Sequence, residues 1–365
     1  MLEPQLKSES TPIVDDWAER SQFWLGTYTD SLPRRKRRER EPSPLVLTGQ
    51  GLSMRVDKGA LVIRDGNTHY PAQVREWRFF KGALDLPPRI IVIDGSGNIT
   101  LDAIDWMGEQ SIPLIRLRWD GHVTSIMHGT GYAADPKKVA WQLETRTDEA
   151  ARIRFAIPLI TRKIKETLIT LQECFPSSLA RNKAVVAAHD VLNELETRTP
   201  ATASDLLGLE GRSARAYFRC WRSLAINWKG LNQHPIPDEW LGYSTRSTVR
   251  QRKSPENRRA THPINAMLNY AYGMLEGQTR IKIITQGYDP TKGILHGEKY
   301  NDRHTFVFDQ MEPARPLVDR SILALIKDNT FSPSDFTINA AGTCRLNPEL
   351  ARVVVRCVNN AELQG

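Results

Sequence analysis

The spacing of apolar residues changes along this chain, and this change constrains the fold more than any other feature. Between residues 45 and 130, short aliphatic runs such as LVLTG, ALVIR and RIIVID are separated by Gly-containing turns, the first being Asp57-Lys58-Gly59. Such runs are typical of strands, and these turns favour hairpins. After Asp135 the apolar residues recur every three or four positions, which is typical of helices. The sequence therefore predicts two structurally different parts.

The first part, residues 45–130, is predicted to be a small, mainly β domain. It contains further strand candidates in PLIRLRW and HVTSIM and one short helical candidate, LDAIDWMGEQ. Asp65-Gly66-Asn67 and Asp120-Gly121 are expected to form additional turns because Asp, Asn and Gly favour tight turns.

The second part, residues 136–340, is predicted to be a larger all-α domain, which makes the fold class α+β. Residues 1–44 are polar and basic and are expected to be an N-terminal extension or linker. Residues 341–365 are expected to be a C-terminal tail. Helical patterning covers 144–173, 182–197, 209–226, 262–276 and 316–327, with breaks expected at Pro158, Pro200, Pro235, Pro237 and Pro255.

The net charge of +8 is concentrated in one fifty-residue stretch. Residues 211–260 contain eleven basic and three acidic side chains, so this stretch accounts for the whole excess. The conspicuous run RRKRRER at residues 34–40 contributes little, because residues 1–40 have a net charge of only +1. Such a concentration of charge favours a polyanionic partner such as nucleic acid; a solvated helix face is the alternative.

Composition excludes several classes of protein. With 40% hydrophobic and 25% charged residues, the chain is typical of globular proteins and too apolar to be disordered. No window resembles a membrane span or a signal peptide, so we expect a soluble, cytoplasmic protein. The four cysteines form no CxxC pair, which predicts buried free thiols and neither a zinc site nor disulfides.

The segment from Glu210 to Leu224 is predicted to form an amphipathic helix that carries one misplaced carboxylate. At about 100° per residue, four arginines fall on one stripe and the apolar side chains fall opposite. Glu210 lies within the apolar face, where an unpaired carboxylate is costly unless it is neutralised, hydrogen-bonded or bound to a metal. The alternative is a first-turn position in which Glu210 only complements the helix dipole. The stripe consists of Arg212, Arg215, Arg219 and Arg222, and the apolar face of Ala214, Tyr217, Phe218 and Trp221.

A second unusual segment places a histidine and two acids close together in the sequence. His296 ends a short apolar run, and Asp309 follows residues 305–308, which are expected to form a strand. Glu312 lies three residues beyond Asp309, a spacing at which two side chains can point the same way. A lone histidine or acid pair is more often structural than functional, but here both occur in one tight segment.

Together with Glu210, these side chains are donors suited to a hard divalent cation. Mg²⁺ and Mn²⁺ take carboxylate oxygens, and Mn²⁺ also accepts an imidazole nitrogen. Beside a phosphodiester, such an ion can activate a nucleophile and stabilise negative charge on phosphoryl oxygens. With a basic platform nearby, the residues indicate metal-dependent phosphodiester chemistry on DNA or RNA.

Three motifs resemble those of the CRISPR-associated protein 1 family, the integrases of spacer acquisition. LLGLEGRSARAYFRCW resembles the motif that carries the family's metal-binding glutamate, which falls on Glu210. HPINAMLNYAYGML resembles the Pro-x-Asn-Ala-x-Leu-x-x-x-Tyr helix, which places Asn265 and Tyr272. We expect structural roles for these two residues, in helix capping and core packing.

The third motif supplies the histidine and the two acids. GYDPTKGILHGE followed by FVFDQMEPARPLVD resembles the family segment that places these residues at His296, Asp309 and Glu312. The mainly β domain with LDAIDWMGEQSIPLIRL also matches, so the resemblance covers about residues 45–330.

This resemblance implies a β N-terminal domain, a helical catalytic domain and a homodimer. It also implies assembly with the CRISPR-associated protein 2, one dimer of which would bridge two integrase dimers. The implied reaction is transesterification, in which the 3′-hydroxyl of a short prespacer DNA attacks the repeat backbone at the leader end and then at the far end.

By the same resemblance, Glu210, His296 and Glu312 hold Mg²⁺ or Mn²⁺, and Asp309 supports the metal or the nucleophile. The contacts to the DNA backbone are our own inference from the charge distribution. We expect them from the stripe and from a second basic stretch, namely Arg212, Arg215, Arg219, Arg222, Arg246, Arg250, Arg252, Lys253, Arg258 and Arg259.

Two features depart from the family pattern. Glu312 stands where some relatives have Asp, and the N-terminal 44 residues lie outside the resemblance; they could be a linker or the remnant of a fused domain. Alternatives to the integrase are a stand-alone metal-dependent DNA nuclease, a non-catalytic nucleic-acid-binding protein and a structural scaffold.

Overall fold

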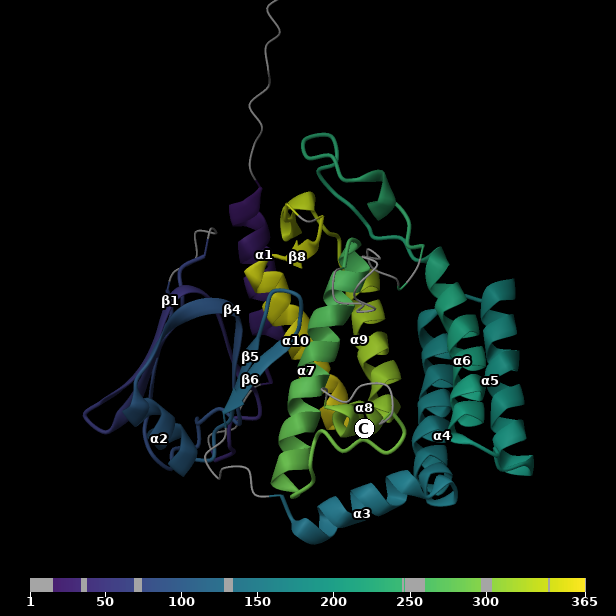
Figure 1. Cartoon of the computed structure of the whole chain (residues 1–365). Helices are drawn as coiled ribbons and strands as arrows, with labels where there is room; N and C mark the ends of the chain where they lie inside the picture. Colours follow the sequence, from purple (N-terminus) through teal and green to yellow (C-terminus); the bar gives the residue numbers. More distant parts are fainter. Residues whose placement is uncertain are drawn as a thin grey trace, which may run out of the picture.

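The protein has a mixed α+β fold, with an N-terminal sheet followed by a mostly helical region (Figure 1). The structure is a computed structural model, and it describes residues 16–33, 38–68, 74–127, 134–244, 246, 260–296, 304–340 and 342–364. None of the helices in these ranges is long and apolar enough to cross a membrane.

Six strands form a mixed sheet in the order β3-β2-β1-β4-β5-β6. β1 pairs in parallel with β4, and β4 with β5, whereas the other neighbours are antiparallel. Lys58 and Gly59 form the predicted β1–β2 hairpin turn. β2 and β3 form an antiparallel hairpin, but Asp65-Gly66-Asn67 is not the tight turn that the sequence predicts; Asn67 instead forms an isolated bridge to Gln50 of β1. The strands are β1 (Leu45–Asp57), β2 (Ala60–Arg64), β3 (Glu76–Phe79), β4 (Ile90–Ile99), β5 (Leu114–Leu117) and β6 (Val123–Met127).

Both faces of the central strands are covered by helices. Ile90 and Val92 of β4 pack with α2 (Leu101–Glu109), whereas Ile91 and Ile93 belong to the core shared with α7 (Pro263–Thr285). Successive strand side chains point to opposite faces, so an unbroken aliphatic run is expected where both faces are buried. The sheet and the helical region therefore share one core.

The helical region is larger, and its helices exceed the predicted bounds at most ends. Pro158 was predicted to break a helix but lies inside α4. Ala156, Ile160 and Ile164 of α4 are buried against α5 and α6 on either side of the proline, and this packing offsets the lost backbone hydrogen bond. The helices are α3 (Pro136–Thr147), α4 (Glu149–Cys174), α5 (Leu179–Thr197), α6 (Ala203–Cys220), α7, α8 (Thr305–Met311) and α9 (Arg315–Asp328), with short 3₁₀ helices at Trp221–Ser223, Asp238–Trp240, Glu312–Ala314 and Pro333–Asp335.

Helix α7 approaches the sheet closely at two glycines. A Cβ atom on Gly273 would lie 1.6 Å from the carbonyl oxygen of Gly121, in the predicted turn between β5 and β6. Gly121 has φ +79°, which other residues rarely adopt. The backbone of α7, which leads towards the candidate site, is therefore fixed directly against the sheet.

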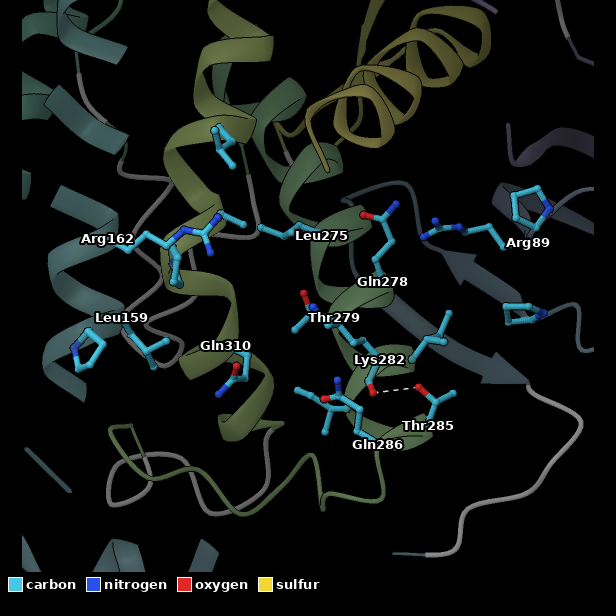
Figure 2. Close-up of a pocket in the computed structure, with 18 of the residues that line it drawn as sticks. Arg89, Leu159, Arg162, Leu275, Gln278, Thr279, Lys282, Thr285, Gln286 and Gln310 are labelled. Atoms are coloured by element: carbon cyan, nitrogen blue, oxygen red, sulfur yellow. Dashed lines mark hydrogen bonds between the residues drawn. The ribbon is translucent and has the colours of Figure 1, made fainter. Parts of the chain in front are cut away.

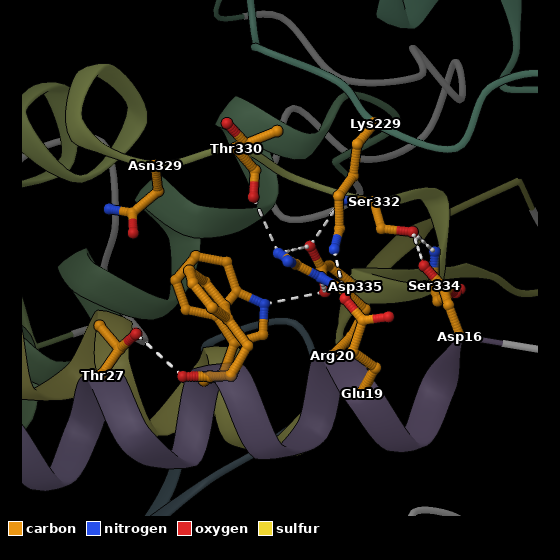
Figure 3. A network of polar contacts seen from close by, with 12 residues as sticks. Asp16, Glu19, Arg20, Thr27, Lys229, Asn329, Thr330, Ser332, Ser334 and Asp335 are labelled. Carbon is orange, nitrogen blue, oxygen red and sulfur yellow. Dashed lines mark hydrogen bonds and ion pairs between the residues drawn. The ribbon is translucent and has the colours of Figure 1, made fainter.

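The N-terminal extension predicted from the sequence is a helix for part of its length. Residues Trp17–Ser31 form α1, whose Trp24 is fully buried and whose Arg20 forms a buried ion pair of 2.7 Å with Asp335 (Figure 3). Trp24 also donates to the Asp335 carboxylate over 2.8 Å. The sequence did not predict this helix because its apolar content is low. A few aromatic residues and one buried ion pair attach it to the core.

The predicted C-terminal tail is also structured. It comprises β8 (Cys344–Leu346), which pairs with β7 (Phe336–Ile338), and α10 (Pro348–Gln364). The predicted all-α domain thus includes part of a small two-stranded sheet. Arg352 of α10 forms a buried ion pair of 2.5 Å with Asp65, which joins the last helix to the N-terminal sheet.

All four cysteines are free thiols, as predicted. Cys220 and Cys344 are buried, whereas Cys174 and Cys357 are partly exposed.

Candidate active site

Glu210 lies in the middle of α6 and not in its first turn. The helix begins at Ala203, where Thr202 and Asp205 form a reciprocal capping box. Such a box satisfies backbone N–H groups at a helix start, so the start of α6 is well defined. The alternative role of Glu210, in which it only complements the helix dipole, is therefore wrong.

Glu210 and Glu312 both bind the same ammonium group. Lys163 of α4 places its Nζ 2.6 Å from Oε1 of Glu210 and 2.5 Å from Oε2 of Glu312. Glu312 opens the 3₁₀ helix Glu312–Ala314 and also meets Arg315 over 3.3 Å. Two carboxylates that are distant in sequence thus converge on one positive charge.

These contacts change the acid–base properties of the cluster. Burial alone would raise the pKa of Glu312, but the charges of Arg315, Lys163 and His296 outweigh it and lower that pKa to about 2. Burial would likewise lower the pKa of Lys163, yet Glu312 and Glu210 raise it above its usual value. At neutral pH, Glu312 is therefore ionised and Lys163 carries its positive charge.

The His296 loop is held by one buried carboxylate. Asp309 accepts hydrogen bonds from the backbone N–H groups of Ile294 (2.6 Å), Leu295 (3.0 Å) and His296 (3.0 Å). Its Oδ1 also lies 2.7 Å from Nδ1 of His296. Because a carboxylate accepts hydrogen bonds, this contact favours a proton on Nδ1 of His296 and directs Nε2 away from Asp309.

Residues 305–308 are the first part of helix α8, so the predicted strand is wrong. The run of β-branched and aromatic residues favoured a strand locally, but tertiary packing overrides that preference. Phe306 and Val307 are buried in the main core on the helix, and Asp309 projects from the same short helix into the loop.

The carbonyl side of the same loop is held by Arg152 of α4. Its guanidinium donates to the carbonyl oxygens of Ile294 (2.8 Å) and Leu295 (3.2 Å). At the start of the loop, Gly293 donates to Thr305 Oγ1 over 3.0 Å and lies so close that a Cβ atom there would be 2.6 Å from the Thr305 side chain. The loop that carries His296 is thus fixed on both sides of its backbone.

The donors of the site suit a hard divalent cation. Glu210 and Glu312 supply carboxylate oxygens, and they already share one cation, the Lys163 ammonium. A carboxylate bonded to Nδ1, as Asp309 is to His296, is the usual support of a metal-binding Nε2. Among the described residues, however, no three His, Cys, Asp or Glu side chains are already gathered as a ligand set.

A second buried carboxylate lies next to this cluster. Asp319 of α9 accepts hydrogen bonds from the hydroxyl groups of Tyr217 (3.0 Å) and Tyr272. A cavity of about 190 Å³ separates this group from the cluster, and its lining includes Lys163, Glu210, Tyr272, Arg315 and Asp319. Tyr272 is thus a hydrogen-bonding residue of the site as well as a packing residue.

Asn265 and Arg246 lie beside each other at the start of α7. Asn265 is buried and accepts from the Tyr243 hydroxyl over 3.0 Å, consistent with its expected structural role. Arg246 contacts the side-chain oxygens of Asn265 and Asn269 over 3.3 Å, so it is partly engaged with the protein.

The predicted arginine stripe is exposed, but α6 ends at Cys220, so Arg222 lies in the 3₁₀ helix that follows. Arg215 and Arg219 are exposed, and neither forms an ion pair with another described residue. Arg212 meets Glu194 of α5 over 2.5 Å, and Arg222 donates to the Ser244 carbonyl over 3.2 Å. The other predicted DNA contacts lie outside the described residues: Arg250, Arg252, Lys253, Arg258 and Arg259.

A larger cavity of about 920 Å³ is lined in part by residues that flank Glu312 in the sequence, among them Gln310 (Figure 2). Arg89, Arg162 and Lys282 line it, and no acidic side chain of the described residues does. Gln310 and Pro313 also line it, so this basic hollow and the carboxylate cluster share one wall.

The sequence did not reveal three charged residues of the site. Arg315 could have been found, because it lies three residues after Glu312, a spacing at which side chains on a helix are neighbours. Lys163 and Arg152 gave no signal, since each reaches its partners across long sequence separations, up to 149 residues for Lys163.

The chain is similar to proteins of one family. A family profile described as "CRISPR associated protein Cas1" matches residues 45–360. A curated CRISPR-associated endonuclease Cas1 from Methanospirillum hungatei JF-1 is 27% identical over 318 residues, which cover 83% of this chain and 82% of the relative.

Two solved structures share the fold. A casposase bound to integration product has a TM-score of 0.67 at 26% identity, over 87% of this chain and 82% of that chain. A Cas6-RT-Cas1–Cas2 complex has a TM-score of 0.63 at 20% identity, over 91% of this chain and 33% of that chain, and shows the fold alone. Since the family profile spans most of the sequence, the chain belongs to the Cas1 family of CRISPR-associated proteins.

Proposed function

We propose that this chain is the integrase of CRISPR spacer acquisition and that its helical region is the catalytic domain. The observation that carries the proposal is the convergence of Glu210 and Glu312 on one cation beside the His296 loop. The casposase similar in both sequence and fold was solved with an integration product, which favours strand joining over hydrolysis alone.

The proposed reaction is a transesterification. The 3′-hydroxyl oxygen of a short prespacer DNA forms a bond to a phosphorus atom of the repeat backbone, first at the leader end and then at the far end. The bond from that phosphorus to the adjoining 3′-oxygen breaks, and this oxygen leaves with a proton as a new 3′-hydroxyl. One phosphodiester replaces another, so no co-reactant is consumed.

Glu210, Glu312 and Nε2 of His296 are the proposed ligands of Mg²⁺ or Mn²⁺. Bound there, the ion would activate the attacking hydroxyl and stabilise charge on the phosphoryl oxygens. Glu312 suits this role because its lowered pKa of about 2 keeps it ionised. Glu210 suits it because it reaches the same cation from another helix.

Asp309 is proposed to position His296 and not to bind the metal itself. Its two oxygens already accept bonds from three backbone N–H groups and lie against Nδ1 of His296. This arrangement fixes the ring orientation and directs Nε2 away from Asp309.

The exposed arginines of α6 are proposed to hold the DNA backbone. Arg215 and Arg219 are free of ion pairs with described residues and lie on the helix that carries Glu210. Each phosphate that such side chains neutralise adds affinity and salt dependence.

The active assembly is proposed to contain more than one chain. Family membership suggests a homodimer and a Cas2 dimer that bridges two such dimers. The fold shared with the Cas6-RT-Cas1–Cas2 complex is consistent with this arrangement.

A strand-joining assay tests the proposal. Purified protein, with and without Cas2, is given a labelled duplex with free 3′-hydroxyl ends and a target containing a leader and repeat, in Mn²⁺, Mg²⁺ or EDTA. We expect joined product with either ion and none in EDTA, and a loss of at least about 100-fold in His296→Ala, since a metal ligand is removed.

Two outcomes would contradict the integrase. Cleaved target without joined product would identify a stand-alone nuclease that uses the same site. Binding of DNA with no change in either strand under any metal condition would identify a non-catalytic binding protein.

A further inference from the structure

Lys163 lies between the two carboxylates and contacts both. Its Nζ lies 2.6 Å from Glu210 and 2.5 Å from Glu312, and its side chain is only 17% exposed. A buried ammonium between two carboxylates is well stabilised, whereas either carboxylate without a cation would be costly.

A divalent ion held by these carboxylates would rely on the same two negative groups that Lys163 contacts. Lys163 donates to Oε1 of Glu210 and Oε2 of Glu312, so ammonium and ion compete for both groups and repel each other by charge. The two cations cannot make the same contacts at the same time.

The structure provides room for the ammonium to leave. The cavity of about 190 Å³ beside the cluster is lined by Lys163, Glu210, Arg315 and Asp319, among others. Asp319 is a buried carboxylate whose present partners are the hydroxyl groups of Tyr217 and Tyr272. A short movement of the Lys163 side chain into this cavity keeps it close to negative charge.

We infer that Lys163 is a built-in counter-ion that holds Glu210 and Glu312 together in the metal-free protein and is displaced when the divalent ion binds. The inference rests on the proposed function, in which these two carboxylates are metal ligands. It assigns Lys163 a positioning role: the ligand pair is assembled before the ion arrives, at the expense of some affinity for the ion.

An ordinary structural ion pair behaves differently, and the chain offers a matched control. Arg320 of α9 lies between Glu166 (3.1 Å) and Glu173 (3.4 Å), two glutamates of α4. It is also one cation between two carboxylates, but no metal is proposed there. Its removal should have the same effect on stability with and without a divalent ion.

The experiment measures Mn²⁺ affinity by calorimetry and the melting temperature in EDTA and in saturating Mn²⁺. The proteins are the wild type, Lys163→Met, Arg320→Met and Glu210→Gln. We expect Lys163→Met to bind Mn²⁺ about tenfold more tightly, because the competing charge is gone, and to melt below the wild type in EDTA but not in Mn²⁺. Arg320→Met should bind Mn²⁺ as the wild type does and melt lower by the same amount in both conditions.

Lys163→Gln serves as the second variant if Lys163→Met does not fold in EDTA, because its amide can still donate to one carboxylate without adding charge. It should show the same tighter Mn²⁺ binding. Unchanged or weaker Mn²⁺ binding in the folded variant would overturn the inference and make Lys163 a permanent partner of the two acids.

If the proposed metal site itself is wrong, the same experiment gives a different result. If Glu210→Gln binds Mn²⁺ as tightly as the wild type, the metal is not held at this cluster, and the roles proposed for Glu210 and Lys163 are both wrong. If Glu210→Gln loses Mn²⁺ binding but Lys163→Met gains none, only the role of Lys163 is wrong.

Discussion

The two halves of the candidate site are held together by different forces. Glu210 and Glu312 are joined through one side chain, Lys163, by charge and hydrogen bonds. His296 is held through its backbone, with Asp309 on the N–H side and Arg152 on the carbonyl side. The first arrangement can exchange its cation, whereas the second has no group that an ion could replace.

This difference suggests that the two halves of the site have different roles in binding an ion. Long side chains on α4 and α6 can adjust to an ion, but a loop clamped by five hydrogen bonds to its backbone presents His296 in one orientation. A fixed imidazole nitrogen from His296 and adjustable carboxylate oxygens from Glu210 and Glu312 would allow the site to bind a single ion without refolding. We expect the two halves to respond differently to mutation, and four variants test this from the largest effect on stability to the smallest.

Asp309→Ala should have the largest effect on stability. It leaves three backbone donors and Nδ1 of His296 without their acceptor in a buried place, which we expect to cost about 4 kcal/mol. Urea unfolding in EDTA measures this loss. Asp289→Ala is the control, since Asp289 accepts from Thr291 at an exposed turn nearby, and it should cost only about 1 kcal/mol. Equal losses in the two variants would mean that the loop is not clamped by Asp309.

Glu312→Gln should be nearly as costly at neutral pH and should depend on pH. The pKa of Glu312 is lowered from 4.5 to about 2, so its charge stabilises the folded protein above pH 4.5 and this contribution disappears as pH falls to 2. Such a shift corresponds to about 3 kcal/mol. Unfolding of wild type and variant in EDTA should therefore differ at pH 6 and converge towards pH 2. A constant difference across this range would contradict the ionised state of Glu312.

Arg152→Met should cost about 2 kcal/mol, because two buried carbonyl groups lose a charged donor. The direct measurement is hydrogen exchange at the amides of Ile294, Leu295 and His296, which should become faster in the variant while α6 amides keep their protection. Unchanged exchange in the loop would show that Asp309 alone holds it.

Arg215→Glu combined with Arg219→Glu should leave stability within about 0.5 kcal/mol, since both side chains are exposed. DNA affinity should fall, and the slope of log affinity against log salt should decrease by about 1.8 because two phosphate contacts are lost. Arg78→Glu combined with Lys81→Glu makes the same charge change in β3 and the turn after it, and should leave the slope unchanged. Identical slopes in both double variants would indicate that the arginine stripe is a solvated helix face that does not contact DNA.

Sequence reasoning found the candidate site residues more readily than the basic residues that contact them. Glu210 was found because it is misplaced on an apolar helix face, and His296, Asp309 and Glu312 because they are close together in the sequence. Lys163 and Arg152 were invisible because both lie on a long helix in which basic residues are common, and their partners come from distant segments.

Long-range contacts also explain why the sequence mispredicted two segments of the chain. Residues 1–44 have few apolar residues, yet Trp24 and Arg20 bind α1 to Asp335, more than 300 positions away. Residues 305–308 have strand-like composition, but burial of Phe306 and Val307 makes them helical. Local preference and composition cannot report such long-range contacts.

The central claim is that the two halves of the site meet on one ion. Pulsed electron paramagnetic resonance of Mn²⁺ bound to the wild-type protein tests it directly, because coupling to a ligand nitrogen shows whether an imidazole is bound. We predict coupling to one imidazole nitrogen in the wild type and its loss in His296→Gln, with Mn²⁺ still held by Glu210 and Glu312. Bound Mn²⁺ without nitrogen coupling, or coupling that survives in His296→Gln, would show that His296 does not bind the same ion as Glu210 and Glu312.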